Sequence, residues 1–148
     1  MDKGVLLCCQ NRTVFMSGVK TEKMVKSVKV GITIGDKNGI GPEVILKALK
    51  DPRILSGITP VIYGCESVLN HYRKTLGFEQ VKFERVSSAD KAAHKQINLV
   101  NVLKNESSVK EGTEEESSGS LAIKAIEVAS ADISSGKIDA IVTAPISK

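Results

Sequence analysis

The strongest constraint on the fold is an alternation of apolar, strand-like runs with stretches of helical periodicity. Residues 28–34 (VKVGITI) form a β-rich run and residues 35–41 a glycine-rich loop. Pro42 then suits the first turn of a helix, where its missing N–H would have no partner. We predict further strands at residues 59–64, 81–86, 97–103 and 138–142, and helices at residues 66–76 and from Ser117 or Ser118 to Gly136. This order predicts an α/β fold with a mainly parallel sheet and flanking helices.

The last apolar run, residues 138–142 (IDAIV), is nearly continuous, which is typical of a parallel strand buried on both faces. No helix follows it to cover the strand. We therefore expect a truncated polypeptide. The alternative is a complete domain whose last strand is covered by other helices or by a partner.

Composition narrows the function. The formal charge is +4, aromatic residues make up 3% and Trp is absent, so a nucleic-acid surface with stacking aromatic side chains is disfavoured. The cysteines, Cys8, Cys9 and Cys65, form no CxxC knuckle and fit reduced thiols in the cytoplasm. No apolar run has the length of a membrane span.

The first residues differ from the remainder of the chain. Residues 1–24 lack clean periodicity, and Met24 has the character of a natural start that runs into the first strand. We therefore expect residues 1–24 to be an extension, non-native or disordered. Residues 25–148 form the predicted α/β segment.

The glycine-rich loop is the first candidate site. Asp36 and Asn38 could contact a polar ligand, and Gly39 and Gly41 allow close approach of a ligand to the backbone. Glu43 lies in the first turn of the helix, whose free N–H groups suit an anion. The spacing is neither GxGxxG nor a Walker A loop. A purely structural strand-to-helix turn is the alternative.

The end of the last strand is the second candidate site. Thr143, Ser147 and Lys148 place hydroxyl groups and an ammonium where α/β sheets bind ligands, and these groups suit a phosphate or carboxylate. The alternative is an ordinary loop with a surface lysine. His71 and His94 are isolated and Cys65 has no evident base, so we identify no catalytic residue and no metal site in this chain.

Two stretches resemble signatures of the 4-hydroxythreonine-4-phosphate dehydrogenase family. GITIGDKNGIGPEVILKAL (residues 31–49) is similar to the family's GDPxGIGPE opening, and SGKIDAIVTAPISK (residues 135–148) to its G-x-[VI]-DAIVTAPI-x-K segment. The helical stretch between them matches at Gly119, Ala122, Ile126, Glu127 and Ala129. The resemblance covers about residues 25–148. Lys37 and Asn38 depart from it, since Pro and a small residue are common there.

The resemblance implies part of a fold like that of isocitrate and isopropylmalate dehydrogenases, with two α/β domains around a cleft in a homodimer. It implies NAD-dependent oxidation of 4-phosphohydroxy-L-threonine, followed by decarboxylation, in pyridoxal phosphate biosynthesis. It also implies a divalent metal (Zn, Mg or Mn) held by histidines beyond Lys148. We therefore expect a fragment that lacks the metal and most substrate and cofactor residues, and that is inactive alone. A non-catalytic anion- or nucleotide-binding module and an inactive truncated product are the alternatives.

Overall fold

The computed structural model describes residues 8–9, 12–13, 27–103 and 108–146. The predicted extension, residues 1–24, lies outside these ranges except for two short strands that pair antiparallel. The elements, in chain order, are β1 (Cys8–Cys9), β2 (Arg12–Thr13), β3 (Val28–Thr33), α1 (Gly41–Leu49), α2 (Ile54–Gly57), β4 (Ile58–Gly64), α3 (Glu66–Thr75), β5 (Phe83–Val86), a 3-10 turn (Ala89–Lys91), β6 (Ile97–Asn101), α4 (Glu116–Ser134) and β7 (Ala140–Thr143).

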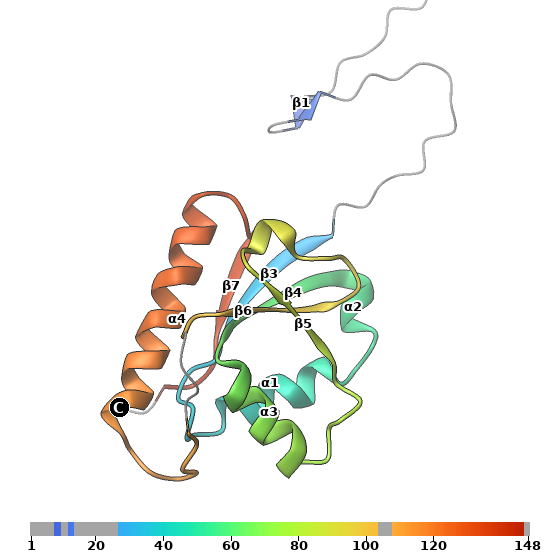
Figure 1. The fold of residues 1–148 in the computed structure, drawn as a ribbon. Helices are drawn as coiled ribbons and strands as arrows, with labels where there is room; N and C mark the ends of the chain where they lie inside the picture. The colour runs from blue at the N-terminus through green and yellow to red at the C-terminus, as the bar shows by residue number, and fades with distance from the viewer. Residues whose placement is uncertain (1–7, 10–11, 14–26, 104–107, 147–148) are drawn as a thin grey trace, which may run out of the picture.

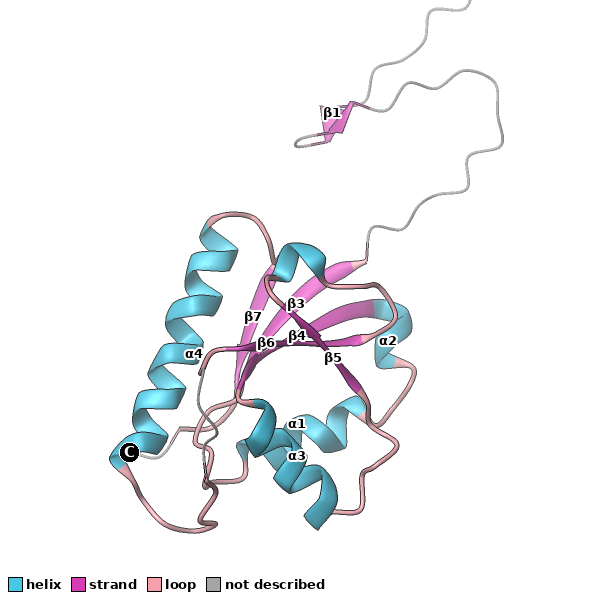
Figure 2. Cartoon of the chain, in the orientation of Figure 1, coloured by secondary structure: helices cyan, strands magenta, loops and turns pink. Residues whose placement is uncertain are grey.

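The main sheet has five strands in the order β5-β6-β4-β3-β7, and every neighbouring pair is parallel. Helix α4 packs on β3, β4 and β7. Helices α1 and α3 contact each other and lie on the other side of the sheet (Figures 1 and 2). The predicted α/β class with a parallel sheet and flanking helices is confirmed.

The core follows from this layering. Strand β4 is the central strand, and its Val61, Ile62 and Tyr63 are fully buried because helices cover both of its faces. On α4, Leu121, Ala125 and Ala129 are buried at helical spacing and face the sheet, whereas Ile133, further along the helix, is 37% exposed.

The glycines end the helices as predicted. Gly77 follows α3 with φ +66° and Gly136 follows α4 with φ +72°, a left-handed conformation that glycine adopts without a Cβ penalty. The predicted cap of α4 is wrong. The helix begins at Glu116, and Glu115 precedes it with no side-chain capping bond. Ser117 and Ser118 both lie inside the helix, so neither is its N-cap, and the hydroxyl of Ser118 donates to Asp36.

The prediction that the last strand is buried on both faces is also wrong. Among the described strands β7 pairs with β3 alone, so it forms an edge of the sheet. Ile141 is half-buried and Val142 is 55% exposed. A continuous apolar run shows that a strand can be covered on both faces, but the covering elements are set by tertiary structure. Within the described ranges, no helix is long and apolar enough to cross a bilayer.

Candidate functional site

The glycine loop, residues 35–41, connects β3 to α1 at the carboxyl end of the sheet (Figure 1). Gly35 has φ +69°, and a Cβ placed on it would lie 2.4 Å from the carbonyl oxygen of Pro145. The chain turns here in a conformation, and with a closeness to a neighbouring segment, that favour glycine. The loop is therefore built around its contact with the end of the last strand.

Two hydrogen bonds fix that contact. The amide of Asp36 donates to the carbonyl of Pro145 at 3.1 Å, and the amide of Ala144 donates to the carbonyl of Thr33 at 3.1 Å. The two motifs, which lie about a hundred residues apart in the sequence, thus meet side by side at the carboxyl edge of the sheet. This is the edge at which open α/β sheets bind their ligands.

The polar side chains of the loop are occupied within the fold. Asp36 and Asn38 are 9% and 3% exposed. One carboxylate oxygen of Asp36 accepts the amide of Asn38 at 2.9 Å and the hydroxyl of Ser118. The Asn38 side chain accepts the amide of Lys110 at 2.9 Å and donates to the carbonyl of Thr113 at 3.0 Å. These side chains therefore attach the glycine loop to the segment that precedes α4.

Lys37 strengthens the same attachment. It is 2% exposed, and its ammonium donates to the carbonyl of Ser108 at 2.9 Å and lies 3.4 Å from a Glu115 carboxylate oxygen. Lys110 donates to the other oxygen of Glu115 at 2.9 Å, and this bond holds the pKa of that carboxyl at about 2. Lysine is rarely buried without such partners. The two residues that depart from the family pattern, Lys37 and Asn38, thus have structural roles here.

Tyr72 of α3 binds the glycine loop through its hydroxyl. Its hydroxyl donates to the carbonyls of Lys37 and Gly39 at 3.0 and 3.2 Å, and burial raises the pKa of Tyr72 to about 12. The sequence analysis did not identify Tyr72 as a residue of the site. A tyrosine on the buried side of a helix indicates a hydrogen bond to a polar group, because a buried tyrosine hydroxyl usually has such a partner.

Ser118 is the second residue that sequence reasoning missed. It is 3% exposed and lies in line with the buried residues Leu121, Ala122 and Ala125 of α4. A serine in register with an apolar stripe predicts a buried hydroxyl that needs a partner. The identity of that partner, Asp36, depends on tertiary structure and has no local signal.

The remaining predicted loop residues lie together at the start of α1. Gly39 is half-buried and donates its amide to the Asp36 carbonyl at 3.2 Å. Gly41 is buried, and a Cβ there would lie 2.6 Å from the carbonyl oxygen of Ile34. Glu43 is half-buried in the first turn and pairs with Lys47 at 2.5 Å. Its carboxylate is thus neutralised along the helix surface.

The predicted residues of the strand end are only partly described. Thr143 is exposed at the last position of β7. Ser147 and Lys148 lie outside the described residues. The phosphate-binding interpretation of this strand end therefore stays a prediction.

A hollow of about 240 Å³ lies beside the glycine loop and the start of α4. Its lining residues are Asp36, Glu114, Glu115, Glu116, Ser118, Gly119 and Ile146. Carboxylates dominate this lining, so the hollow suits hydrogen-bond donors or cations better than a phosphate group.

No metal centre forms in the part of the chain that the structure describes, since no three residues among His, Cys, Asp and Glu are placed so that they could hold one ion. His71 pairs with Glu111 at 3.0 Å and His94 contacts Thr59 at 3.2 Å, each apart from the other. Cys65 is buried, at 2% exposure.

Fold and loop together define a parallel α/β domain with a glycine loop at its strand ends. The chain belongs to the PdxA family, because the family's sequence model, described as pyridoxal phosphate biosynthetic protein PdxA, matches residues 56–148. The predicted family resemblance is thereby confirmed, and with it the α/β fold of the isocitrate and isopropylmalate dehydrogenase type.

Curated relatives carry two related names. The chain is 40% identical to a 4-hydroxythreonine-4-phosphate dehydrogenase of Bacteroides thetaiotaomicron, over 82% of this chain and 33% of that protein. A protein of the same name from Hydrogenobaculum sp. is 42% identical, over 80% of this chain and 36% of that protein. A D-threonate 4-phosphate dehydrogenase of Pectobacterium atrosepticum is 33% identical, over 80% of this chain and 37% of that protein.

Solved structures agree. A 4-hydroxythreonine-4-phosphate dehydrogenase from Burkholderia phymatum matches with a TM-score of 0.74 and 29% identity, over 82% of this chain and 37% of that one. The enzyme of that name from Klebsiella pneumoniae matches with a TM-score of 0.71 and 27% identity, over 85% of this chain and 39% of that one. The chain therefore spans about a third of the length of the curated relatives that it matches.

Proposed function

We propose that residues 25–148 are the N-terminal α/β segment of a 4-hydroxythreonine-4-phosphate dehydrogenase that acts in pyridoxal phosphate biosynthesis. In the proposed reaction the secondary alcohol of 4-phosphohydroxy-L-threonine is oxidised to a 3-oxo acid as NAD is reduced, and the 3-oxo acid then loses CO₂. The names of the relatives at 40% and 42% identity support this substrate. A cytoplasmic homodimer is part of the same proposal.

One observation carries the proposal most directly. The glycine loop and the end of β3 make backbone hydrogen bonds to the segment that follows β7 at the carboxyl edge, from Asp36 to Pro145 and from Ala144 to Thr33. These are the two stretches that resemble the family. A parallel sheet binds ligands at this edge, and the start of α1 adds free N–H groups that suit an anionic substrate.

The described residues do not form a recognisable binding site for the divalent metal or for NAD. They bring no set of metal ligands together, and the sequence holds no GxGxxG fingerprint for NAD. We therefore assign these residues no step that involves the metal or the nicotinamide. Their proposed role is to shape one wall of the substrate site and to exclude water from it.

A second substrate follows from the comparisons. The relative from Pectobacterium atrosepticum is named for D-threonate 4-phosphate, which carries a hydroxyl where the amino acid substrate carries its ammonium. Both substrates share the phosphate and the oxidised alcohol, so one fold serves either. D-threonate 4-phosphate is therefore the competing substrate in the test.

The test grafts residues 25–148 onto the matching remainder of the Bacteroides thetaiotaomicron relative and follows NADH formation. The isolated chain, the chimera and the intact relative are compared with both substrates, each with added Zn²⁺, Mg²⁺ or Mn²⁺. We expect no turnover by the isolated chain and turnover of 4-phosphohydroxy-L-threonine by the chimera. A chimera that folds by circular dichroism yet oxidises neither substrate would refute the proposed function. Turnover by the isolated chain would refute the expectation that it lacks residues needed for catalysis.

A further inference from the structure

The amino end of the sheet carries a groove that lies far from the glycine loop. Its volume is about 430 Å³, in the range of small-molecule sites. It is bounded by the end of α1, by α2, and by the segments that lead into β5 and β6. Because those two parallel strands begin here, the groove opens at the opposite end of the sheet from the proposed substrate edge.

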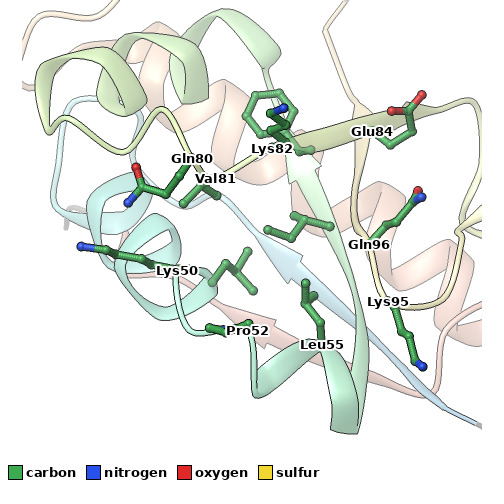
Figure 3. Close-up of a pocket in the computed structure, with 12 residues that line it drawn as sticks. Lys50, Pro52, Leu55, Gln80, Val81, Lys82, Glu84, Lys95 and Gln96 are labelled. Atoms are coloured by element: carbon green, nitrogen blue, oxygen red, sulfur yellow. The ribbon is translucent and has the colours of Figure 1, made fainter.

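The floor of the groove is apolar. Leu49, Val81 and Ile97 come from three different segments and are about 5% exposed or less, so they are anchored in the core. Pro52 and Leu55 extend the apolar surface toward α2. Figure 3 shows these two residues along one border of the groove, with Val81 across from them. An apolar part of a ligand would replace water on this surface.

The rim is cationic. Lys50 and Lys95 lie on opposite sides of the groove and Lys82 on a third side (Figure 3). Glu84 is the one acidic residue of the lining, and in that view its carboxylate and the ammonium groups of Lys50 and Lys95 all point outward from the groove. The lining thus carries three ammonium groups and a single carboxylate.

The three lysines differ in the partners that they have among the described residues. Lys50 lies 5.0 Å over the ring of Phe78. Neither Lys82 nor Lys95 forms an ion pair with an acid of the described residues, a property that they share with Lys74 and Lys91, whereas Lys47 pairs with Glu43. An unpaired ammonium beside an apolar floor favours an anionic ligand.

The backbone at Lys95 supports the same site. Lys95 has φ +62°, and it is the one non-glycine residue in the described ranges with a positive φ. That conformation is unfavourable for a side chain with a Cβ, and such residues cluster at functional sites.

We propose that this groove binds a small organic anion with an apolar body, held by Lys82 and Lys95 over the floor of Leu49, Val81 and Ile97. The proposal does not depend on the proposed function, because the groove and the glycine loop lie at opposite ends of the sheet. A ligand here would be an effector of the protein and not its substrate. The alternative is a pair of solvated surface lysines with no ligand.

The probe is 1-naphthyl phosphate, titrated into the ¹⁵N-labelled 148-residue chain and followed by amide shifts. We expect one saturable site whose shifts map to residues 80–84 and 95–97. Inorganic phosphate, which lacks the apolar body, should bind at least about tenfold more weakly, as should uncharged 1-naphthol. Shifts that do not saturate, or that centre on the apolar hollow that Val44, Ile45 and Val142 line between α1 and β7, would overturn the proposal.

The variant that tests the two lysines is Lys82→Gln with Lys95→Asn. Asparagine tolerates the left-handed conformation, so the second change removes a charge without new backbone strain. We expect binding of 1-naphthyl phosphate to weaken by about fivefold or more. Lys124→Gln, on an exposed position of α4 across the sheet, is the matched control and should leave binding unchanged. Equal affinity in the double variant and the wild type would refute the assignment.

Discussion

The contact between the glycine loop and the end of the last strand can be tested by Gly35→Ala. Gly35 combines two constraints, a φ of +69° and a Cβ position only 2.4 Å from the carbonyl oxygen of Pro145. Gly77 has nearly the same φ, +66°, but nothing lies within 4 Å of its Cβ position. The pair therefore separates the cost of the backbone conformation from the cost of the close approach.

The magnitudes follow from the geometry. Gly77→Ala should lower the free energy of unfolding by about 1–2 kcal/mol, the cost of a left-handed residue with a Cβ. Gly35→Ala carries that cost too, and it also forces the backbone at Pro145 away from the loop. That movement breaks the Asp36 to Pro145 hydrogen bond, worth about 1 kcal/mol, and adds strain of about 1–3 kcal/mol. We expect a total of about 4 kcal/mol.

The assay is urea unfolding followed by far-ultraviolet circular dichroism, since the chain has no Trp to report by fluorescence. Gly136→Ala is a second control, because Gly136 has φ +72° and also has open space at its Cβ position. If Gly35→Ala destabilises the chain no more than the two controls do, within about 0.5 kcal/mol, the loop and the strand end do not pack as described. The shared site at the carboxyl edge would then lose its structural basis.

Two further predictions concern the buried tyrosines. Tyr63→Phe removes a hydroxyl that donates to the Asp132 carboxylate at 2.8 Å, and should lower the free energy of unfolding by about 2 kcal/mol, because hydrogen bonds to charged groups contribute about 1.5–3 kcal/mol; a change under about 0.5 kcal/mol in urea unfolding would contradict the bond. Burial raises the pKa of Tyr72 to about 12 from 10.0, so the folded chain keeps a proton that the unfolded chain releases. The contribution of Tyr72 to the free energy of unfolding should therefore be fully present below pH 10 and fall by roughly 2 kcal/mol as the pH rises toward 12. Tyr72→Phe should remove this part of the decline. An identical decline in both proteins would refute the role of burial.

Much of the fold was predictable because it depends on local signals. Gly77 and Gly136 end their helices where the sequence predicted, since a left-handed residue at a helix end favours glycine whatever surrounds it. The meeting of the two motifs was also predictable in outline. Both follow strands of a parallel sheet, and the carboxyl ends of parallel strands lie at one edge.

The partners of the site residues were not predictable. The bond from Ser118 to Asp36 joins residues 82 positions apart and exists only because α4 packs over the end of β3. The burial of Lys37 has no local signal, since an isolated lysine in a loop is ordinarily solvated. The exposure of Val142 was missed for the same reason, because the sequence shows that a strand is apolar but not what covers it.

These contacts restrict how the glycine loop can meet a ligand. One Asp36 oxygen is bonded to Asn38 and Ser118, and both ends of the Asn38 amide are bonded to the segment that precedes α4. A ligand that claimed those side-chain atoms would have to release that segment and break several hydrogen bonds at once. A ligand at the start of α1 would not have to break such bonds, because the first N–H groups of a helix have no partner within the helix. We therefore expect an anionic substrate at this edge to bind through backbone N–H groups near Gly41 and the strand end at Thr143, while Asp36 and Asn38 hold the loop in shape.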